Sequence, residues 1–255
     1  MRKSRIFVLV LLLVLLGGGI YLWRLPAEVG YRLIAARIAP ASLSGLHGTV
    51  WDGHADGLSV LGNDLGALDW HLSKGSLLAG KPLFDLRIAG SDLELAGAVE
   101  RREGSLRVQD LRFTVPAQRL QGLLENADIS LRGSMSGTLA TATLSRAGLA
   151  DVRGDALWRD AVIATPRAEI HLSGLSAGFS TQSDGSIAGT FKDDGSSALA
   201  VDGNFVLRQP NYEAQATLRA RNADAEVEQL LLGIGERQAD GSTRVQAQGS
   251  LLRMH

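Results

Sequence analysis

Hydrophobic side chains recur at every second position along most of this chain, and that period limits the fold more than any other feature. In Leu199–Arg208 the odd positions carry Leu, Val, Gly, Phe and Leu, with Asp202 and Asn204 between them. Gln209-Pro210-Asn211 interrupts the pattern, and Tyr212–Ala220 resumes it. A strand places successive side chains on opposite faces, so two such runs around a short turn predict an antiparallel hairpin with one buried face.

The same alternation recurs in other segments of the chain. They are Phe84–Ile88, Leu93–Val99, Leu106–Val115, Ile129–Leu139, Ala168–Leu172 and Val245–Leu251, with a shorter strand expected at Ile187–Phe191 inside the loop-like stretch Ser183–Ser197. The phase slips at Ser91-Asp92 and at Gln109-Asp110, and such a slip indicates a turn or a β-bulge. With 30 Gly in 255 residues, the chain is predicted to be mainly β: a Gly-rich, largely antiparallel extended sheet, sandwich or groove.

Three segments are predicted to form short helices. Pro26–Ile38 carries Val29, Leu33, Ile34 and Ile38 on roughly one face, and Pro40 follows it. The other two are Ala117–Asn126, which follows Pro116, and Asn222–Ile234, which begins at a plausible Asn cap and precedes Gly235. Proline suits the first position of a helix, Asn its N-cap and Gly the residue after its end.

A long apolar segment lies near the start of the chain. Ile6 to Trp23 contains 18 consecutive residues without a charge, and a helix of that length spans roughly 27 Å, close to the hydrocarbon thickness of a bilayer. Arg2, Lys3 and Arg5 precede the segment. Because positive flanks stay in the cytoplasm, we expect residues 1–5 to be a cytoplasmic tip, 6–23 a single transmembrane helix and 24–255 an exported β-rich domain.

A cleaved signal peptide is the alternative interpretation of this segment. Gly17, Gly18 and Gly19 are small, but Ile20–Trp23 continues the apolar run, and no A-x-A-like site follows closely. The sequence therefore favours an uncleaved anchor. Of the 26 Lys and Arg residues three precede the segment, which leaves 23 against 27 Asp and Glu. The exported part is mildly acidic, so it is expected to face away from anionic lipid rather than to lie along it.

Composition and motifs exclude most chemistry. A net charge of −1 gives no reason to bind nucleic acid, and the absence of Cys removes disulfides and thiolate sites. Gly75–Lys81 has the spacing of a phosphate-binding loop, but Pro82 stands where Ser or Thr must bind Mg²⁺, and the flanking sequence is interpreted as a strand. Gly174–Gly178 (GLSAG) has the spacing G-x-S-x-G, but no strand–helix alternation around it supports a nucleophile elbow. We therefore predict no catalytic residues, no cofactor and no enzymatic activity.

One cluster of His and Asp residues contains side chains of the types that bind metal ions. It comprises His47, His54 and His71 with Asp52, Asp56 and Asp69. His47 and His54 lie in Gly-rich, turn-like sequence, and His71 stands on the solvent phase of Leu68–Leu72. Metal ligands are usually placed on one helix face or around a tight loop. We therefore interpret the cluster as surface residues and predict no metal site.

Two of the four Trp residues follow the apolar segment closely. Trp70 shares the strand phase of Leu68 and Leu72, so packing in the core is its expected role. Trp51 lies in Gly48–Gly53, interpreted as a strand flanked by Gly. Its ring could pack inside or serve as an exposed anchor for a partner, and packing is favoured.

This region carries a resemblance to a known family. Leu43–Gly53 reads LSGLHGTVWDG, and Leu68–Leu72 (LDWHL) and Ser76–Gly80 (SLLAG) follow it. The series is similar to the motifs of the N component of the bacterial type II secretion system, and the length and layout agree over nearly the whole chain. The candidate family-motif or partner-contact residues are Gly48, Thr49, Trp51, Gly53 and Trp70.

The resemblance implies a non-enzymatic accessory subunit of the type II secretion system. It would be a single-pass protein of the bacterial inner membrane with a periplasmic β-rich domain. The partners it implies are other secretion subunits, the outer-membrane secretin possibly among them, and the inner membrane through residues 6–23. The alternative is an AsmA-like periplasmic β-groove protein that binds or shuttles lipid, because Gly, Ala, Val and Leu on the apolar phases would also suit such a groove.

Overall fold

The computed structural model describes residues 24–121, 130–164, 169–222, 227, 228, 231 and 235–250. The predicted tip 1–5 and the predicted transmembrane helix 6–23 lie outside these ranges. Among the described residues, no helix is both long and apolar enough to span a bilayer. The chain divides into two compact units, Met1–Ser91 and Asp92–His255.

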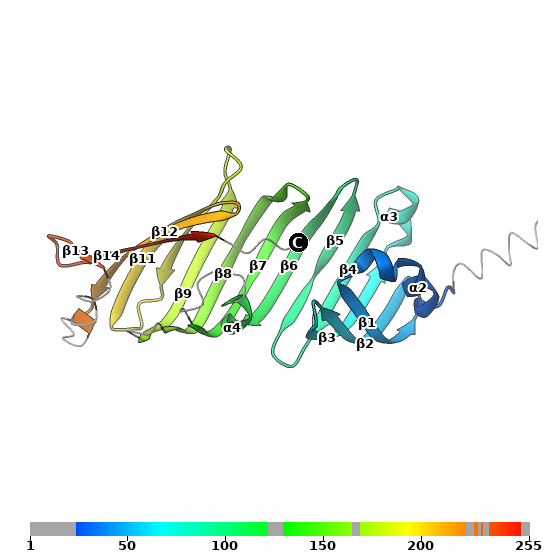
Figure 1. Cartoon of the computed structure of the whole chain (residues 1–255), viewed down its shortest axis with the longest axis horizontal. Helices are drawn as coiled ribbons and strands as arrows, with labels where there is room; N and C mark the ends of the chain where they lie inside the picture. Colours follow the sequence, from blue (N-terminus) through cyan, green and yellow to red (C-terminus); the bar gives the residue numbers. More distant parts are fainter. Residues whose placement is uncertain are drawn as a thin grey trace, which may run out of the picture. The chain divides into compact units, whose positions relative to one another are not determined.

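In its described residues, 24–91, the first unit contains four antiparallel strands and two helices (Figure 1). Its elements are α2 (Ala27–Ile38), β1 (Ala41–Gly48), β2 (Asp52–Val60), β3 (Asn63–Leu72), α3 (Lys74–Leu78) and β4 (Leu83–Ala89). The strands neighbour one another in the order of the chain, β1-β2-β3-β4. Consecutive strands therefore pair as hairpins, as the alternation predicts.

The second unit is also built mainly from consecutive antiparallel strands, and it has more of them than the first. Its elements are β5 (Glu94–Arg102), β6 (Ser105–Pro116), α4 (Ala117–Gln121), β7 (Ser130–Ser145), β8 (Gly148–Ala164), β9 (Glu169–Thr181), β10 (Ile187–Asp193), β11 (Leu199–Arg208), β12 (Asn211–Ala220), β13 (Glu236–Arg237) and β14 (Thr243–Ser250). Strands β5 to β12 follow chain order, and β14 lies between β12 and β13. The prediction of a mainly β, largely antiparallel chain is confirmed.

The predicted hairpins and phase slips are found where the sequence places them. In β11 and β12, Leu207 pairs with Tyr212. Asp110 has a positive φ of 49°, and the β5–β6 register shifts between Ala96 and Ala98, so the slip at Gln109-Asp110 is a β-bulge. The slip at Ser91-Asp92 falls between β4 and β5, where it marks the end of a strand.

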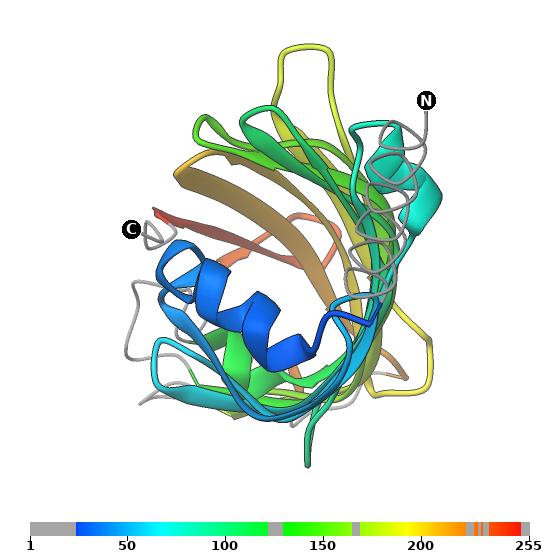
Figure 2. The same cartoon turned by 90° about the vertical axis from the view of Figure 1, so that its right-hand side faces the viewer.

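The sheet of the second unit has one apolar and one polar face, and it curves strongly (Figure 2). Cross-strand partners share a face, so the register places Phe179, Phe205 and Ala214 on one side and Gly178, Asn204 and Gln215 on the other. Most apolar side chains of the first side are half-buried rather than buried. Among the described residues of this unit, strands β5 to β14 belong to one sheet and none forms a second layer, so the unit is a curved sheet and not a sandwich.

Aromatic rings on the apolar face lie directly opposite glycines. Phe113 pairs with Gly137, Phe179 with Gly154 and Gly189, Phe191 with Gly203, and Tyr212 with Gly249. A Cβ on Gly203 would lie 2.4 Å from Cζ of Phe191, and one on Gly189 would lie 2.7 Å from the Phe205 ring. The rings thus fill the space that side chains would occupy, which allows the apolar side to be compressed as the sheet curves.

Three helical segments differ from the sequence-based predictions or lie partly outside the described residues. The sequence on either side of the Gly75–Lys81 spacing forms strands β3 and β4, as interpreted, whereas Lys74–Leu78 between them forms the short helix α3, which was not predicted. The helix predicted at Ala117–Asn126 begins as α4, and its remainder lies outside the described residues. Of Asn222–Ile234, only Val227, Glu228 and Leu231 are described as helical, whereas Asn222 lies in a turn with φ 55°.

The long strand β8 (Gly148–Ala164) was missed by the sequence reasoning. Asp151 and Asp160 have positive φ values of 51° and 49°. Each marks an irregularity in the strand and changes the phase of its apolar residues. The alternation is therefore broken twice within one element, and no run is long enough to signal a strand.

Candidate functional site

Within the segment Gly48–Gly53, Thr49–Trp51 form the turn between the end of β1 and the start of β2, which corrects the interpretation of the whole segment as one strand. Gly48 and Gly53 are the last cross-strand pair of the hairpin. The Thr49 N–H donates to the carbonyl of Asp52 at 2.8 Å. The Thr49 Oγ1 accepts from the N–H groups of Trp51 at 3.2 Å and Asp52 at 3.1 Å. The threonine therefore holds the turn together with its own side chain, as Ser and Thr do in tight turns.

Both glycines of the motif are required by the local geometry. Gly48 has a φ of +80°, and a Cβ there would lie 2.6 Å from the carbonyl oxygen of Asp52. Gly53 lies under the indole of Trp70, where a Cβ would lie 2.1 Å from Cζ2. Trp70 Nε1 donates to the carbonyl of Val50 at 3.2 Å. Trp70 thus covers the turn, and the motif residues gather at one end of the first unit.

Trp51 is half-buried in the turn itself. Its carbonyl accepts from the N–H of Leu72 at 2.6 Å, which ties the turn to β3. The ammonium group of Lys74 lies 5.6 Å from the centre of the Trp51 ring, within the range of a cation–π contact. Half of the indole surface is thus used for local packing, and the rest borders solvent beside a cationic side chain.

The His and Asp cluster lies on the exposed face of β1, β2 and β3. His47 and His54 occupy opposite positions in β1 and β2, not turn-like sequence, and Asp69 faces His54 from β3. Asp56 lies 3.4 Å from Nε2 of His47 and 3.4 Å from Nε2 of His54. His71 contacts Asp52. Among the residues that the structure describes, no group of three such side chains is arranged to hold a metal ion.

The His54–Asp69 contact gives a testable pH dependence. His54 Nδ1 donates to Oδ1 of Asp69 at 2.7 Å, and this hydrogen bond raises the pKa of His54 above its ordinary value, with Asp56 adding to the effect. The contact therefore stabilises the folded protein fully below about pH 6.5. This stabilisation is lost as the pH rises through the raised pKa of His54. We expect an NMR titration of His54 to have a midpoint above about 6.5.

The variant Asp69→Asn should move that midpoint down, because it removes the charged acceptor. Asp202→Asn, on the exposed side of β11, serves as the control and should leave the midpoint unchanged. A midpoint that does not respond to Asp69→Asn would contradict the assignment.

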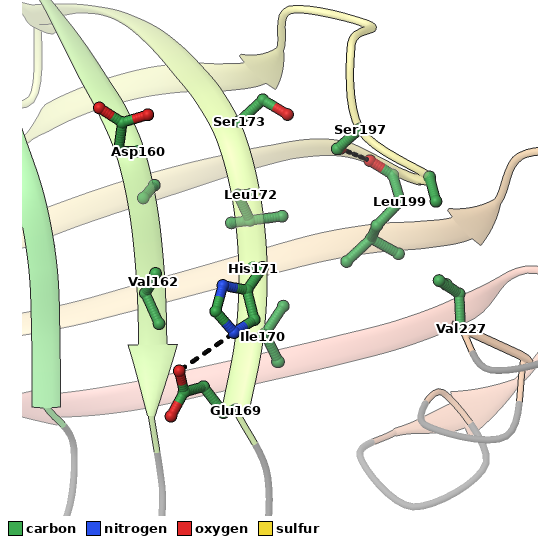
Figure 3. Close-up of a pocket in the computed structure, with 12 residues that line it drawn as sticks. Asp160, Val162, Glu169, Ile170, His171, Leu172, Ser173, Ser197, Leu199 and Val227 are labelled. Atoms are coloured by element: carbon green, nitrogen blue, oxygen red, sulfur yellow. Dashed lines mark hydrogen bonds and ion pairs between the residues drawn. The ribbon is translucent and has the colours of Figure 1, made fainter.

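A pocket of about 620 Å³ opens beside the apolar face of the second unit. It lies where β10 ends: Asp193, the last residue of β10, pairs with Leu175, so the start of β9 has no β10 partner. Residues of β8, β9 and β11 and Val227 line the pocket. Figure 3 shows Leu172 and Leu199 on its inner wall and Glu169 and His171 at its outer side. The early end of one strand thus opens a gap between its neighbours.

The pocket combines an apolar wall with a charged margin. Leu172 and Leu199 are 5% and 4% exposed and belong to the largest buried cluster of the unit. At the margin, Glu169 pairs with Arg132 at 2.6 Å and with Nε2 of His171 at 3.0 Å. A wall of this kind suits an aliphatic group, with polar atoms held outside.

A buried carboxylate, that of Asp193, lies at the end of β10 next to this pocket. The side chain of Asp193 is 2% exposed and lies 2.7 Å from a guanidinium nitrogen of Arg221. It also accepts from the N–H groups of Val201 and Gly195, each at 2.8 Å. Burial alone would raise the pKa of Asp193, but these hydrogen bonds and Arg221 outweigh it and hold the pKa below its ordinary value. Sequence reasoning placed Asp193 only in a turn, because its partner Arg221 is distant along the chain.

The comparisons with known proteins agree with one another. A family model described as "Type II secretion system (T2SS), protein N" matches residues 39–246. The type II secretion system protein N of Klebsiella pneumoniae is 27% identical over 213 residues, which cover 82% of this chain and 83% of that protein. No solved structure matches the chain significantly. The family match includes the turn, the His and Asp cluster and the pocket.

Proposed function

Because the chain belongs to the type II secretion system protein N family and has an accessory role in that system, we propose that it is a non-enzymatic subunit anchored in the bacterial inner membrane. Its anchor is the apolar segment 6–23, and its β-rich part lies in the periplasm. There it contacts other secretion subunits or the secretin, and so promotes the export of folded proteins. The family match over residues 39–246 carries this proposal.

The order of features along the sequence supports the membrane arrangement. Three cationic residues precede 18 residues without a charge, and the β-rich units follow. This order is typical of a single-pass protein whose C-terminal part is exported.

The motif residues support a role in architecture rather than in catalysis. The hydroxyl of Thr49 is engaged by backbone groups of its own turn, and the indole of Trp70 donates to a backbone carbonyl. His47, His54 and His71 each face a carboxylate on the exposed face. The part of the turn that borders solvent, Trp51 with Lys74, is suited to contact a protein partner, since aromatic residues often anchor interfaces.

The open edge of β14 is a second surface suited to a partner. Among the described residues, β13 pairs with β14 only at Thr243 and Arg244, so the outer edge of residues 245–249 carries no further strand there. An exposed edge can accept a strand from another protein. By contrast, α2 packs against the edge strand β1, and the N–H of Leu43 donates to the hydroxyl of Tyr31.

A deletion strain tests the proposed role. We expect folded exoproteins to accumulate in the periplasm when the gene is removed and export to return when the full chain is supplied. Trp51→Ala should reduce that rescue when export is compared at equal amounts of folded protein, a comparison that is needed because the half-buried ring also packs in its turn and its loss lowers the melting temperature. Unchanged export in the deletion strain, with no secretion subunit recovered with the chain, would contradict the proposal.

A second candidate function is favoured by one observation, the pocket with its aliphatic wall on the curved sheet. An AsmA-like role would require a lipid acyl chain to occupy this wall between Leu172 and Leu199. The test uses the full chain in nanodiscs that contain a photoactivatable phospholipid. Labelling of β9 or β11, lost in Leu172→Trp because the larger ring fills the pocket, would support lipid binding. Labelling confined to residues 6–23 would count against it.

A further inference from the structure

Helix α2 turns apolar side chains away from the protein. The sequence predicts that Val29, Leu33, Ile34 and Ile38 lie on roughly one face of this helix. In the structure, Val29 is 36% exposed, Leu33 is 72% exposed and Ile34 is 45% exposed. The side that packs on the first unit carries Ala27, which is 4% exposed, and Gly30. Three of these four apolar side chains thus lie on the outer side of the helix.

The orientation of α2 is fixed by several contacts with the first unit. The hydroxyl of Tyr31 accepts from the N–H of Leu43 at 3.2 Å, and the N–H of Val50 donates to the carbonyl of Leu25 at 3.0 Å. A Cβ on Gly30 would lie 2.5 Å from Cγ2 of Val50, so the helix axis approaches the turn closely. Figure 2, which looks at the β1 end of this unit, shows α2 in front of the strands. The helix therefore cannot rotate to bury Leu33.

The outward side of α2 has the pattern of a helix that lies at a membrane surface. With about 100° between successive residues, Val29, Leu33 and Ala36 fall within about 60° of one another. Arg32 and Arg37 flank this stripe on its two sides, and both are exposed. Arg32 is also 4.0 Å from Glu28. A narrow apolar stripe between two long cationic side chains suits the boundary between acyl chains and lipid phosphates.

The distance along the chain indicates what covers this stripe. The segment without charges ends at Trp23, and α2 begins at Ala27. The three residues between them span at most about 10 Å, while the headgroup layer on each side of a bilayer is about 5–8 Å thick. If residues 6–23 cross the membrane, α2 starts within reach of the headgroups of the same membrane.

We propose that α2 lies in the headgroup layer of the membrane that holds residues 6–23. Val29, Leu33 and Ala36 face the acyl chains, and Arg32 and Arg37 reach the lipid phosphates. This proposal rests on the membrane anchorage proposed above. Since α2 is fixed to β1, its contact with lipid also directs the β1 end of the first unit toward the membrane. The anchored protein would then hold that unit in one orientation instead of on a freely turning tether.

The test places a fluorophore at single cysteines in the full chain, which has no Cys of its own. Leu33→Cys, Thr190→Cys and Leu13→Cys are labelled with the environment-sensitive dye NBD in nanodiscs of phosphatidylethanolamine and phosphatidylglycerol. Thr190 is exposed at the centre of β10 and reports contact with water. Leu13 lies in the apolar segment and reports the anchorage itself. Shallow and deep doxyl lipids and a water-soluble quencher are compared at each position.

We expect the dye at position 33 to be quenched by the shallow doxyl lipid at least twofold more than the dye at position 190, and to be protected from the soluble quencher. The double variant Arg32→Glu with Arg37→Glu should reduce this difference. Deep quenching at position 13 with full access of the soluble quencher at position 33 would overturn the α2 proposal alone. Protection at position 33 from both quenchers would also overturn it, because a protein would then cover the stripe. Absence of lipid quenching at position 13 would refute the anchorage.

Discussion

Replacing Asp193 with alanine is expected to lower the free energy of unfolding by about 3 kcal/mol, because it leaves the guanidinium of Arg221 without its buried partner. The side chain of Asp193 is 2% exposed, whereas that of Arg221 is 29% exposed. Arg221 can therefore regain some hydration, which places the loss at the lower end of the range for broken buried pairs. The backbone N–H groups of Val201 and Gly195 also lose their acceptor. Urea unfolding followed by circular dichroism measures the difference.

The matched control is Asp202→Ala, an exposed carboxylate in β11, which should change stability by less than about 0.5 kcal/mol. The two variants should also differ in how their free energy of unfolding depends on pH. Because the folded pKa of Asp193 is lowered, its contribution is present above about pH 4 and is lost as the pH falls through the folded pKa. The difference in free energy of unfolding between the wild type and Asp193→Ala should therefore become smaller as the pH falls below about 4. Equal stabilities of the two variants at pH 7 would contradict the assigned role of Asp193.

Gly203→Ala is expected to destabilise the second unit by about 2–3 kcal/mol, as overpacking of a well-filled site does. The added Cβ would lie 2.4 Å from Cζ of Phe191 and 2.5 Å from the carbonyl oxygen of Gln215. The ring could shift, but the carbonyl belongs to the backbone of β12 and can move only with the strand. The effect is measured as a shift in the urea midpoint at unchanged slope.

Gly178→Ala provides the comparison for this prediction. Gly178 lies in β9 on the polar side of the same sheet, and a Cβ there would meet nothing within 4 Å. The substitution should be neutral or stabilise by up to about 1 kcal/mol through the unfolded chain. If Gly178→Ala lowered the free energy of unfolding as much as Gly203→Ala, the apolar and polar faces of the sheet would be wrongly assigned.

The sequence alone predicts many of the strands, though not β8, and the pairing of β11 with β12. Alternating residues identify β11 and β12 with their turn, and the phase slip at Gln109-Asp110 identifies a bulge that the structure contains. Both predictions depend only on neighbouring residues. Successive side chains of a strand point to opposite faces, and a one-residue slip in the alternation indicates a bulge or a turn. Gly48–Gly53 was interpreted as one strand, whereas Gly48 and Gly53 form the last cross-strand pair of the β1–β2 hairpin.

What could not be predicted depends on partners that are distant in the sequence. The buried pair of Asp193 and Arg221 requires β10 to end beside β11, which no local pattern specifies. The outward stripe of α2 depends on the contact of Gly30 with Val50, which reverses the face that hydrophobicity alone would bury. The choice between a sandwich and a curved sheet likewise depends on which strands pair along the whole unit, since the described strands β5 to β14 form one continuous order.

Crosslinking in intact cells tests most directly whether this protein works by contacting other secretion subunits. A photoreactive amino acid is placed in the full chain at Asp52 next to the turn, at Gln248 in β14, or at Thr190 in β10 as the control, all of them exposed positions. The account predicts that positions 52 or 248, but not 190, form crosslinks to another type II secretion subunit, identified by mass spectrometry of the crosslinked band. No crosslink to any secretion subunit from either position, in a strain that still exports its exoproteins, would contradict it.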